Sequence, residues 1–226
     1  MYAKNLIIVM DKKIKDKSIL NHPFYRDWQM GKLTMPMLQI YAKQYYKHVA
    51  AFPLYLSAVH TKISDFNDRK LILQNLIDEE SGQNNHIELW LRFGEALGIS
   101  REEMEKTISL KETAAFVNYF KSATSQKSIA EGIAALYAYE SQIPEVSGEK
   151  IKGLINFYGI DNEQGLEYFK VHIQADVEHS RAESKLITRY AIDEYTQKNV
   201  LGIVEQTLDA YWSMLSGIHR ACKQGC

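Results

Sequence analysis

The chain has 226 residues, of which 46% are hydrophobic and 24% are charged, and its formal net charge is −1. This composition excludes a disordered chain and a disulfide-stapled mini-protein. The balanced charge also argues against nucleic-acid binding through a basic surface and against a polybasic membrane anchor.

Apolar residues recur at intervals of three and four along almost the whole chain, which is the periodicity of amphipathic helices. Gly31, Gly98 and Gly159 are placed where helices should end. We predict helices over residues 3–20, 35–62, 67–97, 101–107, 111–123, 127–158, 162–193 and 195–220. The sequence therefore indicates one all-α domain over residues 1–221, followed by a C-terminal tail over residues 222–226.

Cys222 and Cys226 both lie in this tail, where we expect them to be exposed. Two thiols at that position neither staple a core nor complete a zinc site, so we expect a reducing, cytoplasmic compartment. The apolar run over residues 5–10 is too short to span a membrane. We expect neither a membrane nor a nucleic-acid partner, while export through a C-terminal secretion signal stays open.

Four of the predicted helices carry a core-facing stripe that is apolar at both ends and polar in the middle. Charged or imidazole side chains at the centre of such a stripe are costly unless they are paired or bind a metal. A bundle in which all the stripes turn polar at the same height has an internal polar site. The residues at these centres are Glu79, His86, Glu140, His172, Asp176 and His179.

The spacing of these residues points to two metal ions. Residues seven apart on a helix share a face but lie roughly 10.5 Å apart along its axis, so a single ion cannot easily bind His172, Asp176 and His179 together. Two ions about 3.5–4 Å apart, bridged by a carboxylate, can do so. Three carboxylates and three histidines favour iron or manganese over a cysteine-based zinc site. The Glu-x-x-His pairs of ferritin-type bundles are missing, so the topology should differ from theirs.

Structural explanations exist for each of these residues taken alone. A single histidine on a helix face is more often a core or surface residue than a ligand, and His179 could pair with Glu183. His48 lies on a stripe and is a candidate for the pocket lining. The 14 tyrosines could simply fill the core. Lys150 could be either a surface residue or a desolvated amine with a lowered pKa.

Several segments resemble a known family. DEESGQNNHIELW (78–90), GIAALYAYESQIPEVSGEKIKGL (132–154) and YFKVHIQADVEHSRAE (168–183) are similar to the family of the chlamydial death-domain-associating protein. FYRDWQMGKLT (24–34) and YAKQYYKHVAAFPLYLSAVH (41–60) also fit it. This family belongs to the PqqC-like and TenA-like group. The resemblance implies a haem-oxygenase-like helical bundle, usually a homodimer, that holds two metals without haem at the six positions named above.

The resemblance also implies an activity, the formation of para-aminobenzoate for a folate pathway. In that scheme a reductant is needed, iron paired with iron or manganese activates O₂, and Tyr25 is consumed to supply the aromatic ring. Tyr41 would be a nearby redox tyrosine and Lys150 the nitrogen donor. A TenA-type thiamin hydrolase is disfavoured because no cysteine is expected in the pocket. Three alternatives stay open: a di-metal oxygenase acting on a separate small molecule, a PqqC-like oxidase, and a module that binds a host death-domain protein.

Overall fold

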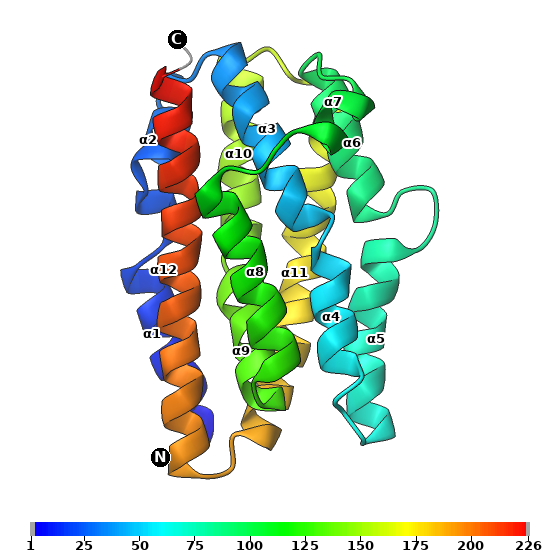
Figure 1. Ribbon diagram of the computed structural model, residues 1–226, viewed down its shortest axis with the longest axis vertical. Helices are drawn as coiled ribbons and strands as arrows, with labels where there is room; N and C mark the ends of the chain where they lie inside the picture. The colour runs from blue at the N-terminus through cyan, green and yellow to red at the C-terminus, as the bar shows by residue number, and fades with distance from the viewer. Residues whose placement is uncertain (1–2, 225–226) are drawn as a thin grey trace.

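A computed structural model describes residues 3–224, which form helices connected by short loops and contain no strand. The all-α prediction is therefore confirmed for the described part of the chain. The helices run along the long axis of the molecule, and α12 spans one side from end to end (Figure 1). The elements are α1 (Ala3–Asp16), a short 3₁₀ turn (Ile19–Asn21), α2 (Pro23–Gln29), α3 (Met35–Val49), α4 (Phe52–His60), α5 (Phe66–Glu80), α6 (His86–Ala96), α7 (Arg101–Lys106), α8 (Lys111–Gln126), α9 (Ile129–Glu140), α10 (Ile143–Phe157), α11 (Glu163–Tyr190) and α12 (Glu194–Gln224).

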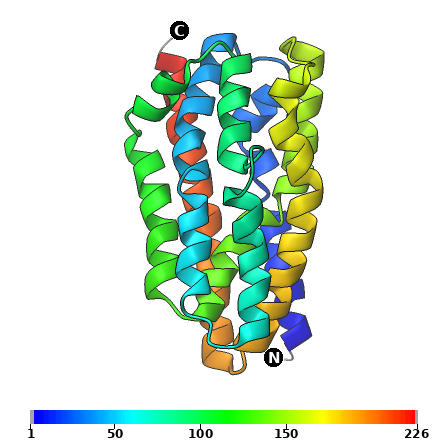
Figure 2. The same cartoon turned by 90° about the vertical axis from the view of Figure 1, so that its right-hand side faces the viewer.

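Three helices that the sequence predicts as continuous are each broken into two. Pro53 and Pro144 stand in the first turns of α4 and α10, because proline cannot donate the backbone hydrogen bond that would continue the preceding helix. Residues 81–85 form a loop between α5 and α6, and Gly82 adopts a φ of 77° there. The breaks between α3 and α4 and between α5 and α6 lie near the middle of the bundle (Figures 1 and 2).

Several predicted boundaries are also corrected. The first helix ends at Asp16 rather than at residue 20, and the short helix α2 has no counterpart in the prediction. Helix α12 continues to Gln224, past the predicted start of the tail, so Cys222 is buried in the bundle instead of exposed. Cys226 lies outside the described residues. The three glycines predicted to end helices, Gly31, Gly98 and Gly159, have positive φ angles of 64°, 79° and 68°.

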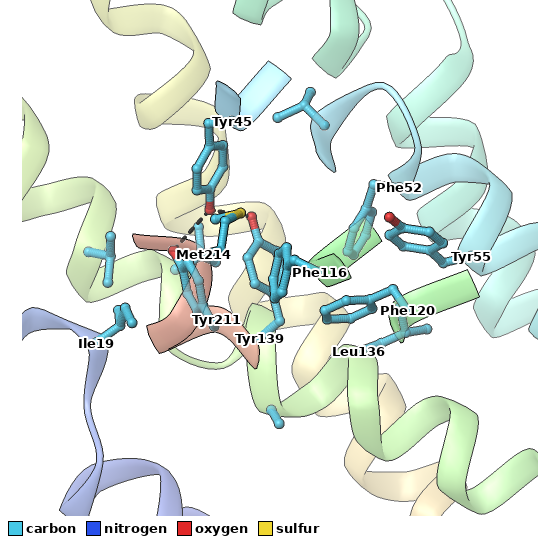
Figure 3. Packing of buried hydrophobic residues seen from close by; sticks show 14 of the residues in the cluster. Ile19, Tyr45, Phe52, Tyr55, Phe116, Phe120, Leu136, Tyr139, Tyr211 and Met214 are labelled. Carbon is cyan, nitrogen blue, oxygen red and sulfur yellow. Dashed lines mark hydrogen bonds between the residues drawn. The ribbon is translucent and has the colours of Figure 1, made fainter. Parts of the chain in front are cut away.

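The core is rich in aromatic side chains and surrounds α9. Every residue of α9 from Gly132 to Glu140 is buried, as expected for a helix with neighbours on all sides. Tyr45 lies within hydrogen-bond distance of both Tyr139 and Tyr211, with Oη–Oη distances of 2.7 and 3.0 Å (Figure 3). Burying these hydroxyls among hydrophobic residues is tolerable because they pair with one another.

No helix within residues 3–224 combines the length and the apolar character that a membrane crossing would require.

Candidate metal centre

The breaks between helices place the predicted ligands at the middle of the bundle. Glu79 lies in the last turn of α5 and His86 is the first residue of α6, so one loop brings both side chains together. Glu140 is the last residue of α9. The unbroken helix α11 supplies the other three ligands from one face, and all six side chains are buried. These three are His172, Asp176 and His179.

The first metal group consists of Glu79, His86 and His172, whose potential ligand atoms all lie within 4.8 Å of one another. His86 Nδ1 lies 2.9 Å from Glu79 Oε1. His172 Nδ1 lies 2.6 Å from the carbonyl oxygen of Tyr168. Because a carbonyl only accepts hydrogen bonds, His172 donates from Nδ1, which leaves Nε2 available to bind a metal, the usual arrangement around metal-bound histidines.

The second metal group consists of Glu140, Asp176 and His179, whose ligand atoms also lie within 4.8 Å of one another. His179 Nδ1 lies 3.3 Å from Glu140 Oε1 and 3.5 Å from Asp176 Oδ1. Its other ring nitrogen, Nε2, lies 3.1 Å from Oδ2 of Asp78. Donation to this carboxylate orients the ring so that Nδ1 faces the group.

The unsatisfied polar atoms test whether this donor set suits metal ions. Glu140 Oε1 and Oε2, Asp176 Oδ2, His86 Nδ1 and His179 Nδ1 are buried and form no hydrogen bond in the described part of the chain, although the two histidine nitrogens lie close to carboxylate oxygens. Buried polar atoms are almost always satisfied in folded proteins. Carboxylate oxygens and imidazole nitrogens are the ligands of iron and manganese, so the residues present fit two such ions.

The two groups border one internal cavity. Glu79 and His172 of the first group and Glu140 and Asp176 of the second group line it, together with His48, Val49, Phe52, Tyr139 and Tyr168. His48 therefore lines the pocket as its stripe position predicts. The shared cavity places the two groups side by side, so the centre can hold two neighbouring ions rather than two isolated ones.

Burial and proximity shift the acid–base properties of the centre. Burial raises the pKa of Asp176 to about 7. Burial alone would lower the pKa of His179, but the carboxylates of Asp176 and Glu140 raise it to about 11. Burial holds the pKa of His172 well below its ordinary value. These opposed pKa shifts arise because carboxylates and imidazoles are buried close together. A bound cation would stabilise the charged carboxylates in such a site.

Tyr25, Tyr41 and Lys150 form a second buried cluster, which we call the tyrosine–lysine cluster. The hydroxyl groups of Tyr25 and Tyr41 are 3.2 Å apart. Lys150 Nζ lies 5.5 Å from the ring centre of Tyr25 and 5.4 Å from that of Tyr41. Burial lowers the pKa of Lys150 to about 7. The sequence left open whether Lys150 is a surface residue, and the structure places it in the core.

Aromatic contacts connect the tyrosine–lysine cluster to the metal centre. The ring of Tyr168 lies 4.1 Å from that of His172 and 4.6 Å from that of Trp90, measured between ring centres. Trp90 in turn lies 6.0 Å from Tyr41, and Tyr41 lies 6.5 Å from Tyr25. The sequence pattern indicates no role for Trp90, Tyr168 or Asp78, although Asp78 directly precedes a predicted ligand.

Comparisons with known proteins show which family the chain belongs to and which proteins it resembles. The family model described as TENA/THI-4/PQQC family matches residues 11–218. A protein named 4-aminobenzoate synthase from Chlamydia muridarum is 47% identical over 85% of this chain and 81% of its own length. A protein of the same name from Nitrosomonas europaea is 40% identical over 93% of this chain and 89% of its own. A pyrroloquinoline-quinone synthase from Klebsiella pneumoniae is more distant, at 25% identity over 89% of this chain and 81% of its own length.

A solved structure from Shewanella denitrificans, titled a domain of unknown function with a heme oxygenase-like fold, superposes with a TM-score of 0.79. It is 14% identical in sequence, and the match covers 99% of this chain and 94% of the other. The chain thus has the expected haem-oxygenase-like fold.

Proposed function

The chain belongs to the TENA/THI-4/PQQC family, and on that premise we propose that it is a di-metal enzyme that forms 4-aminobenzoate from its own Tyr25. One observation carries the proposal. Two groups of metal-ligating residues border one cavity, and the buried tyrosine–lysine cluster is connected to them by aromatic contacts. The names of the relatives at 40–47% identity supply the product.

The first and second metal groups would hold the ions, and we propose iron paired with iron or with manganese. Such ions, when bound, would activate O₂ as the oxidant. Around them the protein supplies a closed environment, because Glu79, Glu140, His172 and Asp176 are at most 5% exposed. This burial keeps bulk water away from the reacting groups.

Tyr25 is the proposed source of the aromatic ring. The ring and Cβ of a tyrosine have the same carbon skeleton as 4-aminobenzoate. The conversion would break the Cα–Cβ bond and oxidise Cβ to a carboxylate at the expense of O₂. It would also release the phenol oxygen as water and form a bond from the ring to Nζ of Lys150, whose Nζ–Cε bond breaks. Tyr25 is 1% exposed, so it is held away from solvent, and its hydroxyl faces Tyr41. Because the residue is consumed, each chain would act about once.

Lys150 is the proposed nitrogen donor. An amine must be unprotonated to act as a nucleophile, and burial lowers the pKa of Lys150 to about 7. Five aromatic rings surround its Nζ within 6.0 Å, and three of them belong to Tyr25, Tyr41 and Tyr45. The amine is thus placed beside the ring that needs nitrogen.

Tyr41 is the proposed redox partner of Tyr25. It lies between Tyr25 and Trp90, and the ring contacts continue from Trp90 through Tyr168 to His172. These residues give an electron leaving the ring of Tyr25 a continuous set of aromatic neighbours.

The proposal also includes an external reductant, a homodimer and a cytoplasmic location. The oligomeric state can be checked by size-exclusion chromatography with light scattering.

The test replaces Tyr25 with phenylalanine. Protein loaded with iron and a reductant in air should yield 4-aminobenzoate, while Tyr25→Phe should yield less than a tenth as much. Chains labelled with ¹⁵N-lysine should give ¹⁵N-labelled product, measured by mass spectrometry. Tyr195→Phe is the control, because Tyr195 is 77% exposed. Undiminished product from Tyr25→Phe, or sustained turnover of an added compound, would instead favour an oxygenase that acts on a separate small molecule.

A further inference from the structure

Glu183 is a buried carboxylate that the six-ligand set leaves without a role. It lies one turn after His179 on α11, and its side chain is 0% exposed. Neither of its oxygens accepts a hydrogen bond from any residue that the structure describes. The sequence suggested His179 as its partner, but His179 faces Asp78, Glu140 and Asp176 instead. A buried carboxylate without a donor is strongly disfavoured unless it binds a proton or a cation.

The groups around Glu183 make its burial more costly. The carboxyl group of Glu140 is adjacent to that of Glu183, and Asp176 is close enough to act on it electrostatically. Tyr137 also lies near Glu183, but its hydroxyl donates to Asp11 at 2.6 Å. Both oxygens of Glu140 lack hydrogen bonds as well. Two neighbouring carboxylates with four unsatisfied oxygens are what a bound cation would stabilise.

The charge of the complete centre also favours a cation bound beside Glu140 and Glu183. Two divalent ions carry four positive charges, and neutral histidines add none. Glu79, Glu140 and Asp176 balance only three of these charges. A fourth carboxylate makes the buried centre neutral, and in a low-dielectric interior a neutral centre is far less costly than a charged one.

We propose that Glu183 is a seventh metal-ligating residue, which supplies a carboxylate oxygen to the ion held by Glu140, Asp176 and His179. Glu183 is not one of the three residues whose ligand atoms lie within 4.8 Å of one another, so ligation would require its side chain to turn toward them. The inference rests on the di-metal centre of the proposed function and is independent of which reaction the centre performs.

The experiment titrates metal-free protein with cobalt(II), whose visible absorption reports its coordination. Glu183→Gln is compared with Glu178→Gln, which changes an exposed residue of the same helix. We expect Glu183→Gln to bind the second equivalent of cobalt at least tenfold more weakly and with an altered spectrum. The first equivalent should bind as in the wild type, and Glu178→Gln should match the wild type throughout.

Thermal unfolding gives a second readout, because the melting temperature of the metal-free variant should rise instead of fall. Metal-free Glu183→Gln should melt above the metal-free wild type, because burying a carboxyl group without a hydrogen-bond partner costs more than burying a neutral amide. Two equivalents bound with wild-type affinity, or a lower metal-free melting temperature with unchanged affinity, would overturn the inference. If the Gln variant does not fold, Glu183→Asp is titrated in its place, and undiminished affinity for the second equivalent contradicts the proposal.

These outcomes separate the inference from the proposed function. A wild-type chain that binds two ions but forms no 4-aminobenzoate contradicts the proposed reaction and leaves the role of Glu183 standing. A wild-type chain that binds fewer than two ions contradicts both.

Discussion

At the scale of the residue, Lys150 bears the clearest energetic cost. Its side chain is 2% exposed, and its ammonium group would be surrounded by aromatic rings. These rings attract a cation only weakly compared with the water that it leaves. Burial therefore lowers the pKa of Lys150 from 10.5 to about 7. The proposed reaction needs Lys150 as a neutral amine. Its burial provides this neutral form but lowers the stability of the folded protein.

The first prediction concerns Lys150→Met. Between pH 7 and 10.5 the unfolded chain binds a proton at this lysine that the folded chain lacks, so the contribution of this group to stability rises with pH. The variant loses this dependence and should be more stable than the wild type at pH 7. Since one pKa unit corresponds to about 1.4 kcal/mol, the difference should shrink by about 2–3 kcal/mol between pH 7 and 9.5. Urea unfolding of metal-free protein at both pH values measures it.

The control for this prediction is Lys152→Met. The side chain of Lys152 lies on the same helix but is 69% exposed. Its removal should change stability by less than 0.5 kcal/mol at either pH, which is the usual range for surface substitutions, about ±0.5 kcal/mol. A stability difference for Lys150→Met that is the same at both pH values would show that Lys150 is charged in the folded protein.

At the scale of the element, the contact between α2 and α10 positions Tyr25. Gly153 on α10 has no side chain, and Trp28 of α2 occupies the space beside it. A Cβ at this position would lie 2.4 Å from Nε1 of Trp28. That nitrogen donates a hydrogen bond to the carbonyl oxygen of Lys150 at 3.3 Å. The close approach thus connects the helix that carries Tyr25 to the helix that carries Lys150.

The second prediction follows from this contact. Gly153→Ala should lower the free energy of unfolding by about 1–3 kcal/mol, the usual cost of overpacking a core, because Trp28 must move. Gly148→Ala on the same helix should be neutral or stabilising by up to about 1 kcal/mol, since a Cβ there meets nothing within 4 Å. Urea unfolding of both variants measures the difference. Equal stability of the two would contradict the tight α2–α10 contact.

The helix breaks define what the sequence could and could not predict. The periodicity gave the helical class and the faces of the long helices, because core-facing stripes repeat with the helix period. It did not reveal the breaks, because the stripes continue in phase from α3 into α4 and from α9 into α10. Pro53 and Pro144 were available as signals, since proline in a helix interior ends the preceding helix.

The candidate metal ligands were more predictable than their neighbours. All six lie at the polar centres of stripes, so the periodicity together with the residue types indicated them. Glu183 continues the same stripe on α11 by one more turn, but the sequence did not indicate the role proposed for it because a simple pairing with His179 was available. Asp78 and Tyr168 could not be assigned, because the contact of Asp78 with His179 and that of Tyr168 with Trp90 join different helices and depend on how the helices pack.

At the scale of the whole molecule, the centre connects four helices at the middle of the bundle. Glu79 and His86 stand on opposite sides of the loop over residues 81–85, Glu140 ends α9, and His172 comes from α11. Without metal these ends are held near α11 by packing and by the ion pairs of His179 on α11 with Asp78 at the end of α5 and with Glu140 at the end of α9. Two bound ions add bonds that cross the interior from three helix ends to α11.

The third prediction is that metal loading stabilises the whole bundle. Each ion should contribute about 2.7 kcal/mol at a concentration one hundred times its Kd, which corresponds to a Tm rise of roughly 5–10 °C for a chain of this size. Metal analysis should find two ions per chain in the wild type and fewer in His86→Ala. His60→Ala is the control, because His60 is neither in a metal group nor on the cavity lining.

Hydrogen exchange localises this effect. Amides at the end of α5 and the start of α6 should gain more protection from the ions than amides in α12, because α12 contributes no ligand to either group. A chelator should reverse both the protection and the gain in Tm. Equal melting temperatures with and without metal would mean that the polar centre is held by the packing of the helices alone, and the six ligands would then have to be explained as a metal-free pocket.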